Sequence, residues 1–507
     1  MNLRQILGDV VDGKTLPDTE ISGLYCDSRQ VEPGGLFFAL PGAVSDGSDF
    51  VDAAVAAGAV AVVAQRSVPV PDGVAFIKVE DARYCMAQAA AAFYGHPARD
   101  MLVVGVTGTN GKTTVTCLVE QMLRRAGYTP AVIGTINNRC GDYCCPAEHT
   151  TPESLDLQRM LADFRRRGAD ALVMEVSSHA LAQRRSSALS FAVTVFTNLT
   201  PEHLDYHKNM ENYFQAKSQL FIDQQADGTG VAVINSDDPY GAKLVTMLDN
   251  VISVGHQSCA AVRVVSCRQD MDGTKAQIHT PSGMLHVNSP LVGHFNLENI
   301  LCAVGVAQAL KIDNAVVEQA LAGDCCVPGR LQRIENDLGA IIVVDYAHTG
   351  DALEKALQAL VALKPRRVIT VFGCGGDRDN SKRPQMGEIA ARYSDLVIIT
   401  SDNPRSEDPD TIMEQICVGA QRICQRLERA EDFASVAGGG YVVIGDRAAA
   451  IASAVALVQE GDLLLVAGKG HEDYQIIAGR TIHFDDGEQI VKALQARRSA
   501  TPQRQRR

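Results

Sequence analysis

The chain has 507 residues, a length that predicts roughly three domains at about 100 to 200 residues per domain. Hydrophobic residues make up 46% and charged residues 21%, which excludes collagen-like and disordered classes and predicts a globular protein with a large core. The formal net charge of −13 disfavours nucleic acid and anionic lipid as partners, so any phosphate must bind at a local site.

The first block of the chain covers residues 1–98 and carries short strand-like runs at 35–40 and 59–63. It ends at a breaker cluster, Gly-His-Pro, at 95–97. Its most apolar stretch, residues 53–64, is shorter than the ~20 residues of a membrane helix, and the N-terminus lacks the apolar core of a signal peptide. The 14 cysteines are scattered without the CxxC spacing of a zinc site. We therefore expect a cytoplasmic protein with reduced thiols and no membrane insertion.

The second block, residues 99–328, opens with a predicted strand at 101–106, a glycine loop and a helix at 115–126. Further apolar runs, separated by helix-length segments, lie at 171–174, 192–196 and 231–234. This alternation predicts a mostly parallel sheet with helices on both faces. Between 262 and 290 the pattern changes to alternating strands with turn residues, which predicts hairpins.

The third block, residues 329–507, repeats the strand, loop and helix pattern. Its predicted strands lie at 340–344, 367–372, 395–400, 441–444 and 463–467, and each ends in a loop rich in Gly or Asp. In such sheets ligands bind beyond the carboxyl ends of the strands. The tail, residues 497–507, is rich in Arg and Gln and has no apolar face, so we expect it to be disordered.

The sharpest chemical signal is the glycine loop after the strand at 101–106. Its residues are Gly108, Thr109, Asn110, Gly111, Lys112, Thr113 and Thr114. Glycines let backbone N–H groups approach a phosphate, the helix N-terminus favours negative charge, Lys112 can reach the terminal phosphates, and a Thr hydroxyl can ligate magnesium. Val106 stands where the strict P-loop pattern has Gly. A tight turn without a ligand is the alternative, but the strand before and the helix after favour phosphate binding.

Two polar clusters in the second block also begin at strand ends. Glu175, His203 and Asp205 could hold magnesium or orient phosphate. A strand-end Glu is often only a helix cap and a lone His only a core group, so both interpretations stay open. Lys217 lies in a helical stretch and, by composition alone, is typical of an exposed helix lysine.

Four loops of the third block follow predicted strands, at residues 345–348, 373–379, 402–405 and 468–472. Together they predict a mouth at the carboxyl edge of the sheet, lined by Arg378, Arg383, Arg405 and Glu472. An anionic ligand that also carries an amine suits such a lining.

These motifs resemble the Mur ligase family, most closely its diaminopimelate-adding members. The strings are GTNGKTT, EVSSH, FTNLTPEHLDYH, GHFNLEN, DYAH, GCGGDRD, DNPR and GKGHEDYQ, in this order over nearly the whole chain. The resemblance implies an α/β fold with three domains: a UDP-substrate-binding domain at 1–98, a P-loop-type ATP-binding domain at 99–328 and a Rossmann-like amino-acid-binding domain at 329–507. It implies a monomer that uses ATP and Mg²⁺ to join meso-2,6-diaminopimelate to UDP-N-acetylmuramoyl-L-alanyl-D-glutamate through an acyl phosphate, in cytoplasmic peptidoglycan synthesis.

The resemblance also implies roles for individual residues. The UDP-sugar would be bound by Ser28, and the muramoyl dipeptide by Thr150, Thr151, Ser177, Gln183 and Arg185. ATP and magnesium would be bound by residues of the second and third blocks. These are the glycine loop with Lys112 and Thr113, then Glu175, His203 and an N-carboxylated Lys217, and finally Asn299, Arg330 and Asp345. Diaminopimelate would be bound by Arg378, Asp402, Asn403, Pro404, Arg405, Gly468 and Glu472.

Two positions depart from the family pattern: His149 stands where Asn is common, and Gly350 where Pro is usual. The first weakens one predicted substrate contact, and the second changes loop stiffness. The alternatives are a lysine-adding Mur ligase, a folylpolyglutamate synthetase, and a nucleotide-regulated binding protein without turnover. The stretch 402–405 argues against the first two, whereas the sequence does not exclude the third. The role of the loop with Cys140, Cys144 and Cys145 stays open.

Overall fold

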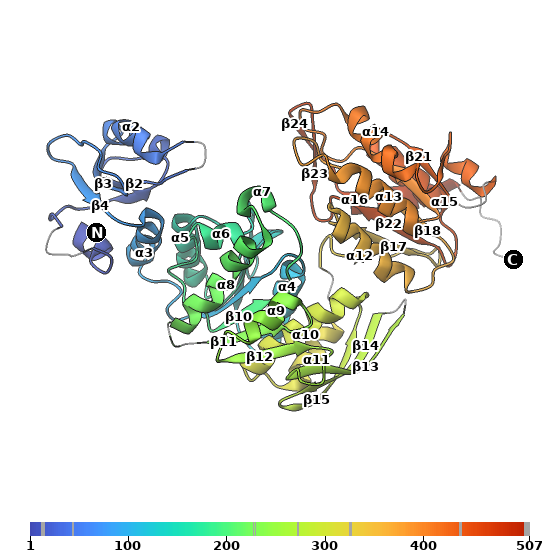
Figure 1. Ribbon diagram of the computed structural model, residues 1–507, viewed down its shortest axis with the longest axis horizontal. Coiled ribbons are helices and arrows are strands. Elements are labelled where there is room, and N and C mark those ends of the chain that lie inside the picture. The colour runs from blue at the N-terminus through green and yellow to red at the C-terminus, as the bar shows by residue number, and fades with distance from the viewer. Residues whose placement is uncertain are drawn as a thin grey trace. The chain divides into compact units, whose positions relative to one another are not determined.

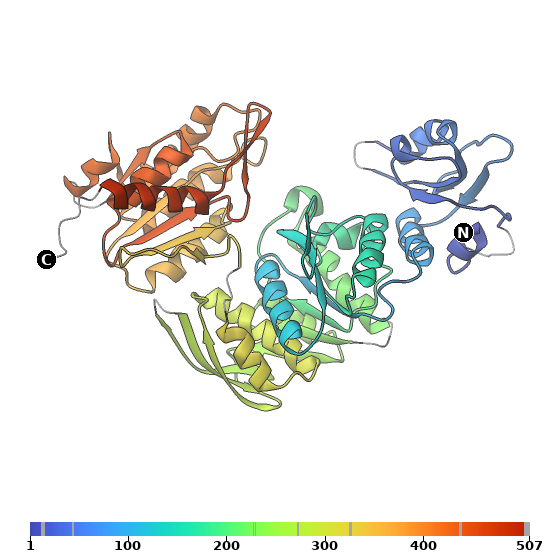
Figure 2. The same ribbon diagram turned by 180° about the vertical axis from the view of Figure 1, so that it is seen from behind.

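The structure is a computed structural model of the chain and describes residues 1–11, 16–42, 45–226, 228, 230–270, 273–323, 327–435 and 439–500. The chain divides into two compact units, drawn in Figures 1 and 2. The first consists of Met1–Arg263, Thr280–Ser282 and Leu301–Val317, and the second of Val264–His279, Gly283–Ile300 and Glu318–Arg507. Within the described ranges, no helix combines the length and the apolar character that a bilayer crossing needs.

The N-terminal part of the first unit is built on a parallel sheet of order β1-β2-β3-β4. The strands are β1 (Gly23–Tyr25), β2 (Gly35–Ala39), β3 (Ala59–Ala64) and β4 (Ala75–Lys78). Side chains alternate along β2: Leu36 and Phe38 pack with α1 (Leu3–Leu7) and α3 (Ala82–Phe93), whereas Phe37 packs with α2 (Val51–Ala56). The sheet is therefore covered on both faces.

The central sheet has the order β15-β14-β13-β12-β11-β10-β5-β9-β6-β7-β8. Its strands are β5 (Leu102–Thr107), β6 (Pro130–Ile133), β7 (Asn137–Cys140), β8 (Tyr143–Pro146), β9 (Ala171–Glu175), β10 (Val193–Phe196), β11 (Val231–Asn235), β12 (Val251–Gly255), β13 (Val262–Asp270), β14 (Gly273–Thr280) and β15 (Gly283–Ser289). The run from β12 through β5 to β6 is parallel. Strand β5 lies between β10 and β9, so the carboxyl ends of these three strands, and the loops after them, are neighbours.

Helices lie between the strands of the central sheet or follow its last strand, β15. They are α4 (Lys112–Arg125), α5 (Ser154–Arg166), α6 (Ser178–Ala182), α7 (Leu204–His207), α8 (Met210–Ala226), α9 (Pro239–Val245), α10 (His294–Ala309) and α11 (Asn314–Ala322). One core joins the sheet to α5 and α8 through residues such as Phe164, Phe196 and Phe221, all fully buried. This packing fixes the two helices that flank the loops after β9 and β10.

The C-terminal sheet has the order β16-β17-β22-β18-β19-β21-β20 and is parallel except for β16. Its strands are β16 (Gln332–Arg333), β17 (Ile341–Asp345), β18 (Val368–Phe372), β19 (Leu396–Ile399), β20 (Gln425–Arg426), β21 (Gly440–Val443) and β22 (Leu463–Ala467). One face packs on α12 (Gly350–Val361), α13 (Lys382–Tyr393) and α14 (Pro409–Ala420), and the other on α15 (Arg447–Leu457) and α16 (Asp486–Ala500) (Figure 1). A hairpin, β23 (Tyr474–Ile477) and β24 (Arg480–His483), follows β22.

The predicted strands of the second and third blocks agree with these elements to within a residue or two, because buried parallel strands produce short apolar runs. The predicted hairpins at 262–290 are β13, β14 and β15, although Asp272 of the predicted turn lies outside the described residues. The prediction for the tail is wrong at its start, because α16 continues to Ala500. Residues 501–507 lie outside the described residues.

Candidate active site

The glycine loop joins β5 to α4. A Cβ atom at Gly108, whose φ is 147°, would lie 1.9 Å from Thr197 Oγ1, so only glycine fits there. Gly111, at φ 86°, is the N-cap of α4. The Lys112 amine bends back over the loop and donates to the carbonyl oxygens of Gly108 at 3.0 Å and Thr109 at 2.7 Å. Backbone N–H groups, a helix N-terminus and a lysine amine therefore converge as an anion site requires.

Side chains from the loop after β10 fix the shape of the glycine loop. Asn198 Oδ1 accepts from the Asn110 backbone N–H at 2.9 Å, and Thr197 Oγ1 donates to the Asn110 carbonyl at 2.6 Å. Thr109 Oγ1 lies 3.2 Å from the hydroxyl of Tyr213 on α8. Thr109 and Asn110 are thus held from outside the loop, so the backbone there is arranged before a ligand arrives.

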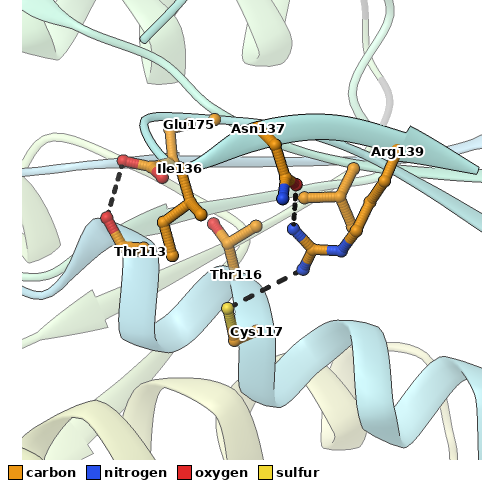
Figure 3. Close-up of a pocket in the computed structure, with 9 residues that line it drawn as sticks. Thr113, Thr116, Cys117, Ile136, Asn137, Arg139 and Glu175 are labelled. Carbon is orange, nitrogen blue, oxygen red and sulfur yellow. Dashed lines mark hydrogen bonds between the residues drawn. The ribbon is translucent and has the colours of Figure 1, made fainter. Parts of the chain in front are cut away.

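The carboxylate of Glu175, at the end of β9, is buried beside the start of α4 (Figure 3). Its Oε2 accepts from the Thr113 hydroxyl at 3.1 Å and from the Thr135 hydroxyl at 2.9 Å, and its Oε1 accepts from the Thr135 backbone N–H at 3.0 Å. A carboxylate and a hydroxyl next to a phosphate loop are the hard oxygen ligands that Mg²⁺ prefers. The chemistry of this pair therefore fits magnesium.

Lys217 is buried, contrary to the interpretation by composition. It extends from α8 with 1% of its surface exposed; its Nζ donates to the Gly108 carbonyl at 2.8 Å and lies 4.9 Å from the centre of the Tyr213 ring. Burial, with a contribution from the charge of Lys112, lowers the pKa of this amine well below its usual value. A neutral amine can add carbon dioxide, and the resulting carbamate would supply two more hard oxygens to a magnesium ion.

His203 begins α7 in a left-handed conformation, with φ 56°. Its ring lies 4.8 Å from that of His179, and its Nε2 is 3.8 Å from a carboxylate oxygen of Glu202. These contacts, in the part of the chain that the structure describes, are with its own loop and α6 rather than with Glu175. Asp205 is exposed. The magnesium-ligand roles of His203 and Asp205 stay predictions, with less support than that of Glu175.

The residues assigned to the muramoyl dipeptide lie together next to Glu175. Thr151 Oγ1 donates to the Glu175 carbonyl at 2.8 Å and accepts from the Ser177 backbone N–H at 3.1 Å. Arg185 donates to the Thr151 carbonyl and to Gln183 Oε1, both at 2.8 Å. A separate contact joins the hydroxyls of Thr150 and Thr135, 3.1 Å apart. One hydrogen-bonded network therefore connects this cluster with the Glu175 carboxylate.

Several other positions of the first unit that the sequence singled out lie outside that network. Ser28 begins a short 3₁₀ helix, η1 (Ser28–Gln30), and is half-buried. His149 is exposed. Cys140 is buried in β7, whereas Cys144 in β8 is exposed. The structure adds nothing to the roles predicted for these positions.

In the second unit, the loops after β19 and β22 form a buried polar cluster. Asn403 Nδ2 donates to Glu472 Oε2 at 2.8 Å. The amine of Lys469, a fully buried residue, donates to Asn403 Oδ1 at 3.0 Å and to the Tyr474 carbonyl at 2.7 Å, and lies 3.2 Å from Asp402 Oδ1. Burial, and then the nearby charge of Asp402, raises the pKa of the Glu472 carboxyl.

The arginines assigned to the predicted mouth differ in exposure. Arg405 is half-buried at φ 55°, and its Nη1 donates to the Gly376 carbonyl at 2.7 Å; Arg378 is exposed. Arg383 is fully buried and donates to both carboxylate oxygens of Glu407 at 2.9 Å, so the prediction that it lines the mouth is wrong. This guanidinium is committed to a structural ion pair.

The remaining assigned residues surround the ends of β17 and β22. Gly468, at φ 116°, donates its N–H to the Asp345 carbonyl at 3.0 Å. The Asp345 carboxylate accepts from two backbone N–H groups, and burial raises its pKa. The Arg330 guanidinium lies 4.6 Å from the centre of the Tyr346 ring, and its buried Nε has no hydrogen-bond partner in the part of the chain that the structure describes. Three further assigned positions are buried, namely Asn299, Pro404 and Gly350.

Comparison with known proteins assigns this arrangement to a family. Three family profiles match successive parts of the chain: "Mur ligase family, catalytic domain" at residues 20–94, "Mur ligase middle domain" at 106–307 and "Mur ligase, glutamate ligase domain" at 329–470. A relative from Geobacter metallireducens is 51% identical over 94% of this chain and 94% of its own length. The chain belongs to the Mur ligase family.

The similar proteins carry consistent names. The relative from Geobacter metallireducens and one from Geobacter sulfurreducens, 50% identical over 94% of this chain and 95% of its own, are both called UDP-N-acetylmuramoyl-L-alanyl-D-glutamate–2,6-diaminopimelate ligase. A solved structure with the same name superposes at a TM-score of 0.71, with 32% identity over 98% of this chain and 99% of the other. The predicted α/β fold of three domains with mostly parallel sheets is confirmed; the exact boundaries stay predictions.

Sequence reasoning missed two residues of this Mur ligase's candidate site. Thr135 follows β6 and holds both oxygens of Glu175, and Lys469 follows β22 and holds Asn403. Each stands directly after a Gly that follows a strand. A Gly at a strand end is the signal that predicted the phosphate loop, and a search for it at every predicted strand would have found both residues.

Proposed function

We propose that this chain is the ligase that adds meso-2,6-diaminopimelate to UDP-N-acetylmuramoyl-L-alanyl-D-glutamate in cytoplasmic peptidoglycan synthesis. The observation that carries the proposal is the match over nearly the full length to relatives of that name, at 50% and 51% identity. Two features of the second unit agree with it: a half-buried guanidinium, that of Arg405, and the two carboxylates of Asp402 and Glu472. A ligand that carries a carboxylate and an ammonium is complementary to such a set.

In this proposal the glycine loop and its neighbours in the first unit bind the phosphates of ATP, and the same unit activates the dipeptide. The loop 108–114 holds the phosphates, Lys112 neutralises charge on the transferred group, and Thr113, Glu175 and carboxylated Lys217 hold magnesium, with His203 as a further ligand. Bound Mg²⁺ supplies electrostatic stabilisation of the phosphoryl oxygens. Asn299, Arg330 and Asp345 bind the rest of the nucleotide, and Ser28 binds the UDP-sugar.

The chemistry requires two steps. A carboxylate is a poor electrophile, so an oxygen of the glutamyl carboxylate attacks the γ-phosphorus of ATP; the bond to ADP breaks and an acyl phosphate forms. The uncharged amine of the amino acid then attacks the acyl carbon, and the tetrahedral intermediate expels phosphate and loses a proton, which leaves the amide. Thr151, Ser177 and Arg185 orient the dipeptide, and exclusion of water protects the acyl phosphate from hydrolysis.

The alternative, a lysine-adding Mur ligase, differs in one chemical group. Diaminopimelate has a second carboxylate where lysine has none, and in this proposal Arg405 takes that carboxylate through two parallel hydrogen bonds. Loss of such a contact costs about 2 to 5 kcal/mol, or roughly thirtyfold to several thousandfold in kcat/KM. Arg405→Ala should therefore lose most of its preference for diaminopimelate. An unchanged preference would remove Arg405 from the specificity pocket.

The proposed reaction is tested by measuring ADP release with the UDP-muramoyl dipeptide and each candidate amino acid. The proposal predicts that release is rapid only when dipeptide, diaminopimelate, ATP and Mg²⁺ are all present, and that it matches the product formed mole for mole. Nucleotide binding without product would instead identify a nucleotide-regulated binding protein.

A further inference from the structure

Lys469 is a buried cation whose contacts are concentrated on the candidate amino-acid site. Its amine hydrogen-bonds Asn403, lies 3.2 Å from Asp402 Oδ1 and lies 3.9 Å from Glu472 Oε2. We propose that Lys469 is a positioning residue that keeps the Glu472 carboxylate charged and holds Asp402 and Asn403 in place, so that the site can accept the ammonium group of its amino acid. The inference rests on the proposed function of that site and adds a residue to it.

The argument begins with the cost of burying Lys469. All of its surface is removed from water, and an ammonium ion without compensation is expensive in such a place. Arg447, another fully buried cation of this unit, is compensated by a bidentate pair with Asp486, at 2.7 Å for each bond. Lys469 makes no such exclusive pair in the described residues: its contacts are divided between two carboxylates, the Asn403 amide and the Tyr474 carbonyl. Its charge is therefore shared by several groups of the site.

The second step concerns the carboxylates. Asp402 and the half-buried Glu472 both have a carboxylate oxygen within 4 Å of the Lys469 amine, and Asn403 donates to Glu472 at 2.8 Å. Asp402 disfavours the charged form of Glu472, so without the shared cation Glu472 takes up a proton more readily. A protonated carboxyl accepts an ammonium ion poorly. With Lys469 present, one positive charge stabilises both carboxylates, and a negative charge remains for the ligand.

The third step gives the sign of the pH dependence. The groups that act on Glu472 are Asp402, Arg405 and Lys469, while Tyr346, Tyr474 and Arg447 also interact with its charge. Burial and Asp402 raise the pKa of Glu472, whereas Lys469 lowers it. Removal of Lys469 therefore raises this pKa further, and a larger fraction of the carboxyl is protonated as the pH falls.

The test compares Lys469→Met, which keeps the length of the side chain but removes its charge, with wild type. At pH 6.5 the KM for diaminopimelate should rise by about tenfold or more, and the increase should shrink as the pH rises to 8.5. The KM values for ATP and for the UDP-muramoyl dipeptide should stay unchanged. Lys469→Arg should retain part of the wild-type behaviour. The double variant D402N/K469M, which also removes the repulsion from Asp402, should show a smaller pH dependence than Lys469→Met, because burial still raises the pKa of Glu472.

Three results would overturn the inference. They are an increase in KM that is the same at every pH, an equal loss for all three substrates, and a pH dependence in the double variant that is as large as in Lys469→Met. If Lys469→Met does not fold, wild type still provides a test, because its KM for diaminopimelate must be flat between pH 6.5 and 8.5. Absence of product from wild type with diaminopimelate would instead overturn the proposed function, so the two failures are distinguishable.

Discussion

Thr135 offers the sharpest test of how the Glu175 carboxylate is held. Thr135→Val replaces a hydroxyl by a methyl group of similar size, and so removes the 2.9 Å hydrogen bond to Glu175 Oε2 while the 3.0 Å bond from the backbone N–H remains. A hydrogen bond to a charged group contributes about 1.5 to 3 kcal/mol, which is roughly ten- to a hundredfold in an equilibrium constant. Loss of a residue that orients a metal ligand has effects of that size on metal affinity. We expect the Mg²⁺ concentration for half-maximal ADP release to rise about tenfold or more.

A pocket lined by Glu175 and Thr116 provides a matched control (Figure 3). Thr116 is buried, and among the described residues its hydroxyl has no hydrogen-bond partner. Thr116→Val makes the same chemical change without removing a bond, so the Mg²⁺ requirement should stay at the wild-type value and the protein should be at least as stable. Thr135→Ser, which restores the hydroxyl, should recover most of the magnesium affinity. Equal Mg²⁺ requirements in Thr135→Val and Thr116→Val would refute the role of Thr135.

Three further predictions concern other parts of the chain. Lys217→Ala should lower turnover about a hundredfold or more and should recover part of it with added acetate, whereas full activity without acetate would exclude the carbamate. Arg447→Met leaves the Asp486 carboxylate buried without its partner, so the free energy of unfolding, measured with denaturant, should fall by about 3 to 5 kcal/mol; an unchanged value would contradict this. A hydrogen bond to Glu488 raises the pKa of His483 above 6.5, so the pair stabilises the fold below that pH and the contribution is lost as the pH rises through the pKa of the folded state. An NMR titration should show that midpoint, and Glu488→Gln should lower it towards 6.5.

The fold could be predicted from the sequence because strands that are buried on both faces produce short runs of apolar residues. The apolar run that predicted a strand at 101–106 corresponds to β5. The glycines after it indicate a loop with positive φ angles, and the structure has such angles at Gly108 and Gly111. The glycine loop was therefore predicted residue by residue. Its supporting hydrogen bonds were not predicted, because they come from Asn198 and Tyr213, which are about ninety and a hundred residues further along the chain.

The burial of Lys217 could have been predicted from its spacing. It stands four residues after Tyr213 and four before Phe221, and both are buried, so one face of α8 carries all three. Arg383 gave no comparable signal. Its ion pair with Glu407 joins α13 to the loop before α14, and only the folded chain shows that this arginine is held by a carboxylate, whereas Arg405 donates to a backbone carbonyl. The sequence pattern therefore predicted the loops of the mouth, but it did not identify which charged side chains of these loops can bind a ligand.

The most direct test of the proposed function is a competition between amino acids. Wild-type protein is incubated with ATP, Mg²⁺, the UDP-muramoyl dipeptide and equal concentrations of meso-diaminopimelate and L-lysine, and the products are identified by mass spectrometry. We predict that the diaminopimelate tripeptide is the dominant product and that its amount equals the ADP released. A dominant lysine tripeptide, or ADP release without either tripeptide, would contradict the assignment.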